Sequence, residues 1–258
     1  MTRAVSAMRA KLKGGNVVVG SALFSWSVNA VDAAGAARLD FVRFDSETSW
    51  RRDSSMEDMV RAALSNDLAP IVRVDKGDPA LVRKALEIGA YGVMVPDIRS
   101  VEDARAVVAA AKFPPYGTRG YSSNCYSAGW GDNGGADWVH WSNTEPLIGI
   151  VIEHPQAVEA VADIVAVDGI DFVQFGATDL AMTLGLGAPD PKHPDVQRAM
   201  QRTFAATRAA GRHIFANVPA DADAVRRHMD FGVTMLELSN DIGILRSAWR
   251  SARKAADQ

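Results

Sequence analysis

The chain has 258 residues, of which 48% are hydrophobic and 23% are charged. This composition is typical of a globular protein and excludes a disordered, collagen-like or coiled-coil chain. Lysine and arginine number 28 against 31 aspartates and glutamates, with no basic block, so we expect neither nucleic acid nor an anionic membrane as a partner. The single cysteine, Cys125, excludes an internal disulfide and a zinc finger. No apolar run reaches the roughly 18 residues of a membrane-spanning helix, and no signal-peptide core stands near the N-terminus. We therefore expect a cytoplasmic protein.

Short apolar runs alternate with amphipathic segments along the chain, as in a regular succession of strands and helices. The apolar runs predict strands at 17–24, 41–45, 69–74, 92–96, 147–153, 172–175, 213–218 and 235–238. The amphipathic segments predict helices at 55–65, 79–89, 101–111, 155–167, 194–210 and 221–231. Asp78 and Ser100 are expected to cap the starts of two helices, and Gly89, Gly211 and Gly232 to end three in the left-handed conformation.

The strand runs are apolar without alternation, which is typical of a parallel sheet buried on both faces. Eight strand–helix units in about 250 residues predict an α/β protein, a single (β/α)8 barrel spanning residues 1–258. A doubly wound open sheet is the alternative. One segment breaks the rhythm: residues 114–145 are rich in Gly, Ser, Asn, Tyr and Trp and show no helical or alternating period. We expect a long, ordered loop insertion there, because long loops in compact domains are usually functional and disordered segments are poor in aromatics.

Catalytic groups of such barrels lie where the strands end. Polar residues end most of the predicted strands: Asp45 and Glu47, Arg73, Asp97, Glu153, Asp179, Asn217, and finally Ser239, Asn240 and Asp241. Asp97 also precedes a helix and is expected to cap it. Two of the carboxylates, Glu153 and Asp179, follow consecutive strands and favour a hard divalent cation, which prefers oxygen ligands. The turn from Gly176 to Asp179 exposes backbone N–H groups that would receive a carboxylate. A cation, such a turn and Arg73 together would hold a 2-oxo acid and stabilise its enolate.

The runs GIVIE (149–153) and VDGIDFVQFGATDL (167–180) resemble those of the HpcH/HpaI family of class II pyruvate aldolases. The similarity extends to IVRV (71–74), ALEIGA (85–90), FPPYGTRG (113–120) and HPDVQ (193–197), and covers nearly the whole chain. The resemblance implies a phosphoenolpyruvate/pyruvate-type (β/α)8 barrel whose last helix is exchanged between subunits of a dimer-based homo-oligomer, commonly a hexamer. It also implies a carbon–carbon lyase that reversibly cleaves a 4-hydroxy-2-oxo acid to pyruvate and an aldehyde.

The same resemblance assigns roles to individual residues. Glu153 and Asp179 match the family's ligands for Mg²⁺, Mn²⁺ or Co²⁺, and Arg73 matches the arginine that stabilises the enolate oxygen. The backbone at Gly176, Thr178 and Asp179 would bind the substrate carboxylate. Asn217, at the end of the seventh predicted strand, joins this group as a substrate-binding candidate, and Asp45 and Glu47 as catalytic candidates.

One departure from the family pattern concerns proton transfer. The segment from Asp45 to Trp50 reads DSETSW, and Thr48 stands where the family places a histidine; Glu87 matches the carboxylate that orients it. Threonine is no general base near neutral pH. Either a metal-bound water takes the proton, or Glu47, Asp97 or His154 does, or the reaction needs no strong base, as in decarboxylation of a 3-carboxy-2-oxo acid. Other lyases on the same barrel and a non-catalytic oxo-acid-binding homologue remain alternatives. The aldehyde, the metal, the stereochemistry and the oligomer size are not predicted.

Overall fold

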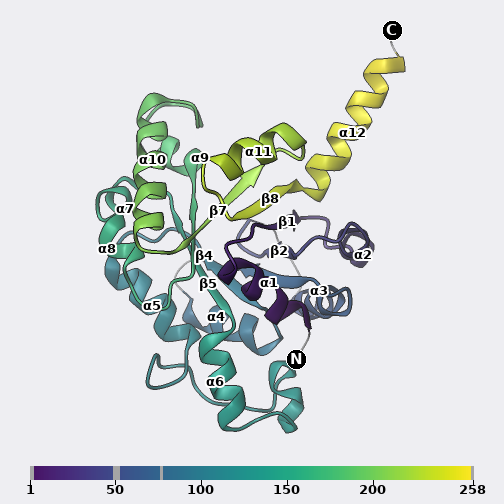
Figure 1. Ribbon diagram of the computed structural model, residues 1–258, viewed down its shortest axis with the longest axis vertical. Coiled ribbons are helices and arrows are strands. Elements are labelled where there is room, and N and C mark those ends of the chain that lie inside the picture. Colours follow the sequence, from purple (N-terminus) through teal and green to yellow (C-terminus); the bar gives the residue numbers. More distant parts are fainter. Residues whose placement is uncertain (1–2, 49–52, 76–77, 257–258) are drawn as a thin grey trace. The chain divides into compact units, whose positions relative to one another are not determined.

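The computed structural model describes residues 3–48, 53–75 and 78–256 (Figure 1), and its eight strands follow chain order around a closed barrel. The strands are β1 (Val18–Leu23), β2 (Phe41–Asp45), β3 (Ala69–Arg73), β4 (Gly92–Val95), β5 (Leu147–Ile152), β6 (Phe172–Phe175), β7 (His213–Val218) and β8 (Met235–Asn240). Each lies within two residues of a predicted strand, and the predicted (β/α)8 barrel is confirmed.

Helices follow the strands. They are α1 (Arg3–Lys13), α2 (Val28–Ala36), α3 (Asp53–Ser65), α4 (Pro79–Glu87), α5 (Val101–Ala111), α6 (Ala136–Thr144), α7 (Pro155–Glu159), α8 (Val161–Val165), α9 (Ala177–Thr183), α10 (Pro194–Ala209), α11 (Ala222–Asp230) and α12 (Asp241–Ala256), with a 3₁₀ helix, η1 (Tyr126–Gly131). The single helix predicted at 155–167 is wrong, because Ala160 leaves helical geometry and separates α7 from α8. None of the helices in the described ranges is long and apolar enough to cross a membrane.

Helix ends follow the expected chemistry. The Asp78 carboxylate accepts the Ala80 N–H at 2.8 Å, and Ser100 forms a capping box with Asp103. Gly89, Gly211 and Gly232 all have positive φ, the conformation that glycine adopts without a steric penalty. The predicted starts and stops are therefore confirmed.

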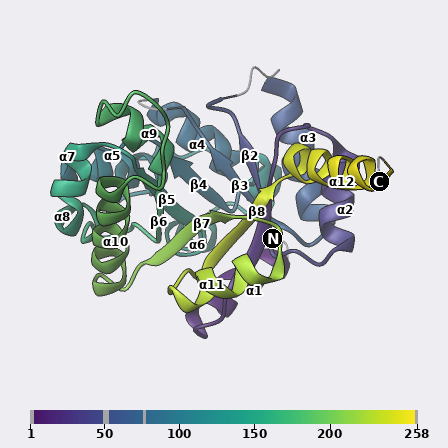
Figure 2. The same ribbon diagram turned by 90° about the horizontal axis from the view of Figure 1, so that it is seen from above.

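Two compact units divide the chain, one formed by Ile71–Phe215 and the other by the segments before and after it. In the first unit, β4, β5 and β6 are paired in parallel register, and α10 packs against α7 and α8 (Figure 2). In the second unit, β1 pairs with both β2 and β8, and α2 packs against α3. Each unit carries its own share of the residues predicted to be functional.

The segment 114–145 is more regular than predicted, because it contains η1 and α6. The sequence of α6, ADWVHWSNT, is poor in strong helix formers, so its helix comes from tertiary packing. Trp138 is 1% exposed and packs edge-on against Phe113, with ring centroids 5.1 Å apart. The Arg119 guanidinium lies 4.6 Å from the Phe113 ring centroid, and its burial lowers the pKa of Arg119 to about 10. Arg119 thus anchors this segment through an aromatic cluster.

Replacing Trp138 by Ala is expected to destabilise the protein by about 3–5 kcal/mol, because removing a fully buried aromatic ring loses apolar burial and leaves a cavity. Trp130, in the same segment, is 61% exposed, so Trp130→Ala is the matched control and should change stability by less than about 0.5 kcal/mol. Urea denaturation of both variants measures the difference. Equal stabilities for the two would contradict the packing described.

Candidate active site

Glu153 directly follows β5 in the first unit, and its carboxylate is held by the backbone of the neighbouring strand end. Its Oε1 accepts the Asp97 N–H at 2.7 Å. Asp97 adopts φ 53°, a left-handed conformation that a non-glycine residue rarely takes and that often marks a functional site. The helix-capping role expected for Asp97 is wrong, since Ser100 caps α5 and the Asp97 carboxylate binds the Arg99 guanidinium at 2.8 and 3.0 Å. Asp97 instead orients Glu153.

Gly176 provides the space in which the Glu153 side chain lies. A Cβ placed on Gly176 would stand 2.5 Å from Glu153 Oε2 and 2.6 Å from Glu153 Cβ, closer than carbon atoms tolerate. Its φ of −90° is open to any residue, so glycine is required here for space and not for backbone conformation. The Glu153 carboxylate therefore rests directly on the turn between β6 and α9.

Asp179 and Thr178 lie in the first turn of α9, immediately after this cradle, and both are exposed. The chemistry of the two carboxylates fits a divalent cation: Mg²⁺ and similar ions use one or two protein carboxylates and complete their shell with water and substrate oxygens. Within the described ranges, no three His, Cys, Asp or Glu side chains converge in a metal-binding group. An ion held by two carboxylates alone would keep open positions for water and substrate.

Arg73 is the last residue of β3, in the same unit, and is paired in register with Met94 of β4. The predicted strand, 69–74, extends one residue beyond Arg73. Glu87, the match for the family's histidine-orienting carboxylate, binds the Arg83 guanidinium one helical turn away at 2.7 Å. His154 stands at the N-cap position of α7, and its side chain makes no capping hydrogen bond.

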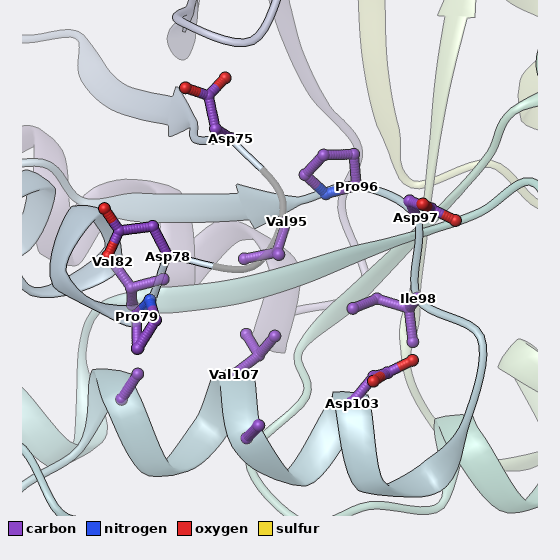
Figure 3. A pocket seen from close by; sticks show the side chains of 12 residues that line it. Asp75, Asp78, Pro79, Val82, Val95, Pro96, Asp97, Ile98, Asp103 and Val107 are labelled. Carbon is purple, nitrogen blue, oxygen red and sulfur yellow. The ribbon is translucent and has the colours of Figure 1, made fainter.

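A small cavity of about 160 Å³ lies between α4 and α5 near the end of β4 (Figure 3). Aliphatic side chains such as Val82 and Val107 line it together with four aspartates, Asp75, Asp78, Asp97 and Asp103. Two of these cap helices and Asp97 binds Arg99. The cavity is linked to Glu153 through Asp97, whose N–H donates to the Glu153 carboxylate.

In the second unit, the end of β2 forms a turn around Asp45. This side chain is fully buried, and its Oδ1 accepts the N–H groups of Glu47 and Thr48 at 3.0 and 3.1 Å. The side chains of Glu47 and Thr48 are exposed. Asp45 is thus a structural centre of the turn, whereas Glu47 and Thr48 present their side chains outward. Ser49 and Trp50 lie outside the described residues.

Two residues that the sequence did not single out complete this region. Arg43 of β2 binds Glu237 of β8 through Nε at 2.6 Å and Nη2 at 2.9 Å, and all of these groups are buried. Burial lowers the pKa of Arg43, but the charges of Glu237 and Asp45 outweigh it and raise the pKa above its ordinary value. Asn217 donates from Nδ2 to Glu237 Oε1 at 3.0 Å and to the Ser239 carbonyl at 3.2 Å. Its amide nitrogen is therefore engaged within the protein.

Comparison with known proteins identifies the family of the chain. A family model described as HpcH/HpaI aldolase/citrate lyase matches residues 22–248. A 5-keto-4-deoxy-D-glucarate aldolase of Escherichia coli O6:H1 is 34% identical over 229 residues, 88% of this chain and 86% of that protein. The crystal structure of an HpcH/HpaI aldolase from Desulfitobacterium hafniense DCB-2 is 30% identical, with a TM-score of 0.87 over 97% of this chain and 96% of that one. A family member from Burkholderia cenocepacia J2315 is 29% identical, with a TM-score of 0.89 over 98% and 99%. The chain therefore belongs to the HpcH/HpaI aldolase/citrate lyase family, which confirms the predicted family and the predicted enzyme class, a carbon–carbon lyase of the class II aldolase type.

Proposed function

We propose that the protein reversibly cleaves a 4-hydroxy-2-oxo acid to pyruvate and an aldehyde, with Mg²⁺, Mn²⁺ or Co²⁺ held by Glu153 and Asp179. The observation that carries the proposal is the Glu153 carboxylate, held by the Asp97 N–H and cradled by Gly176, with Asp179 on the following turn. The Escherichia coli relative is named for 5-keto-4-deoxy-D-glucarate. That compound is therefore the first substrate to test.

The cleavage removes the proton of the 4-hydroxyl group and breaks the bond between C3 and C4. The electron pair passes to the 2-oxo group, and C3 then takes up a proton to become the methyl group of pyruvate. A bound divalent cation would supply positive charge to the developing enolate. Arg73 would stabilise the same negative charge through preorganised N–H donors. The backbone at Gly176, Thr178 and Asp179 would orient the substrate by its carboxylate, and Asn217 would contact the substrate through its amide oxygen.

Among the side chains predicted to transfer a proton in this reaction, Glu47 is the best candidate for the general base. The Asp97 carboxylate forms a bidentate ion pair with Arg99, which engages both of its oxygens. His154 lies beyond the end of β5, at the N-cap position of α7. Glu47 is exposed on the turn around Asp45. Thr48, beside it, would contact the substrate without taking the proton.

Replacing Glu47 by Gln is expected to lower kcat by about 10²-fold or more, the usual contribution of a general base, while pyruvate binding is retained. The measurement is loss of the pyruvate methyl signal in D₂O by proton NMR, with Mn²⁺ and then with chelator. Asp75→Asn, an exposed carboxylate, is the control. If the methyl protons of pyruvate exchange as fast in Glu47→Gln as in the wild type, bound water and not Glu47 transfers the proton.

The same NMR experiment on the wild type tests the proposed activity. Exchange of the methyl protons that depends on the metal, together with cleavage of the keto-deoxy sugar acid, is the expected result. Intact pyruvate binding without exchange would contradict the aldolase and favour decarboxylation of a 3-carboxy-2-oxo acid, which needs no strong base. Binding without turnover of either substrate class would favour a non-catalytic homologue.

We also propose a cytoplasmic, dimer-based homo-oligomer in which α12 is covered by another subunit. None of the residues of α12 is buried, and the helix extends away from the end of β8 (Figure 1). Ile242, Leu245 and Trp249 follow a helical stripe, and Trp249 is 69% exposed. An apolar stripe of this kind is typical of a protein interface.

Replacing Trp249 by Glu is expected to shift the oligomer toward a smaller species, because a charge would be buried in the subunit contact. Light scattering after size-exclusion chromatography measures the mass. Arg250→Glu, one residue along and exposed, is the control for a new charge on the helix. An unchanged mass in Trp249→Glu would contradict the proposed role of α12.

A further inference from the structure

Three charged side chains are buried together in the second unit. Arg43 is 5% exposed, and Asp45 and Glu237 are fully buried. The guanidinium spans both carboxylates: Nε and Nη2 donate to Glu237 at 2.6 and 2.9 Å, while Nη1 donates to Asp45 Oδ2 at 3.1 Å. A planar guanidinium has fixed donor directions and can bind one carboxylate in a bidentate manner while it donates to another, whereas a lysine ammonium is a compact charge without that fixed fork.

Stability alone is a weak reason for such a cluster. Desolvation of buried charges offsets most of their attraction, and apolar residues of similar volume usually stabilise a core as well or better. The cluster also holds two carboxylates against one guanidinium. The cluster instead fixes the orientation of each carboxylate, because hydrogen bonds of defined geometry hold it in place. Asn217 adds a further bond to Glu237 Oε1 at 3.0 Å.

The fixed orientation of the Asp45 carboxylate also holds the backbone of the turn that follows β2. Asp45 uses Oδ2 for Arg43 and Oδ1 for the N–H groups of Glu47 and Thr48, at 3.0 and 3.1 Å. Rotation of the Asp45 carboxylate would therefore release both backbone N–H groups together. We propose that Arg43 and Glu237 are a positioning pair, which fixes the Asp45 carboxylate and through it the turn that presents Glu47 and Thr48.

This proposal has one part that rests on the proposed function and one that does not. If Glu47 moves the proton, a looser turn lowers kcat, because misplacement by about 1 Å can cost about 10²-fold in rate. The order of the turn itself is independent of any reaction. It is read from hydrogen exchange of the Glu47 and Thr48 amides.

The test is Arg43→Lys, which keeps the positive charge and removes the fork. We expect exchange of the Glu47 and Thr48 amides to rise about tenfold, the factor of one lost hydrogen bond, and kcat to fall by about 10–100-fold with little change in KM. Peptides covering β5 serve as an internal reference and should exchange as in the wild type. Arg226→Lys, in an exposed ion pair on α11 of the same unit, is the matched control.

Unchanged exchange at Glu47 and Thr48 in folded Arg43→Lys would overturn the proposal, and so would an equal rise in the β5 peptides, which would indicate a merely structural role. If Arg43→Lys does not fold, the same exchange measurement on Glu237→Gln tests the proposal. It keeps an acceptor oxygen and the shape of the side chain, and faster exchange confined to the turn is expected. Protection at the wild-type level in that variant would overturn the proposal. Should the wild type fail to cleave any oxo acid, the exchange measurement still applies, so the two failures are distinguishable.

Discussion

Replacing Asp179 by Ala is expected to abolish metal-dependent turnover and leave the protein folded. Asp179 is exposed in the first turn of α9, and surface substitutions of this kind usually change stability by less than about 0.5 kcal/mol. Its proposed role is different: with Glu153 it supplies one of two carboxylates for the cation. Losing the cation would remove several kcal/mol of charge stabilisation from the transition state, or at least about 10³-fold in kcat/KM.

Two measurements separate the proposed role from an indirect one. Calorimetric titration with Mn²⁺ reports affinity without requiring a substrate, and thermal unfolding reports the fold. Asp163→Ala is the matched control, since Asp163 is also an exposed acidic residue in the first turn of a short helix in the same unit. It should lose no Mn²⁺ affinity. If Asp179→Ala binds Mn²⁺ as tightly as the wild type, the metal assignment is wrong.

The barrel could be predicted because the local sequence signals of its strands and helices agree with the fold that they form. Continuous apolar runs such as 147–153 are typical of strands buried on both faces, and the caps at Asp78 and Ser100 mark helix starts through a local rule. Helices without such signals were missed. The helix α6 is stabilised by Trp138 in an aromatic cluster, and α9 has only seven residues. Both depend on contacts that the local pattern does not contain.

The candidate site could be predicted in part for a similar reason. Strand ends locate Arg73 and Glu153, because a barrel places its polar groups there, and Asp179 follows in the first turn of the helix after β6. The positioning groups could not be found this way. Arg43 and Glu237 stand inside apolar runs, and their only signal is a charge where burial is expected. The two residues are 194 positions apart in the sequence, and only the fold brings them together.

Replacing Gly176 by Ala is expected to lower metal affinity by about 10–100-fold, the range found when groups that orient a metal ligand are changed. The added Cβ would lie 2.5 Å from Glu153 Oε2 and 2.6 Å from Glu153 Cβ, so the Glu153 side chain must leave its position. The backbone does not oppose the change, because Gly176 has a φ of −90°. The loss should therefore appear in Mn²⁺ binding and in turnover, with a small effect on unfolding.

Gly149→Ala gives the contrasting case on the adjacent strand. A Cβ there would stand 2.1 Å from the Phe172 ring, and overpacking a core commonly costs about 1–3 kcal/mol of stability. Gly149→Ala should thus lower stability more than Gly176→Ala does, with the opposite order for metal affinity. A double-mutant cycle with Glu153→Ala completes the argument: if Gly176 acts through Glu153, adding Gly176→Ala to Glu153→Ala should cost no further Mn²⁺ affinity. Additive losses would mean that Gly176 affects the cation by a route other than Glu153, such as the position of Asp179 in the first turn of α9.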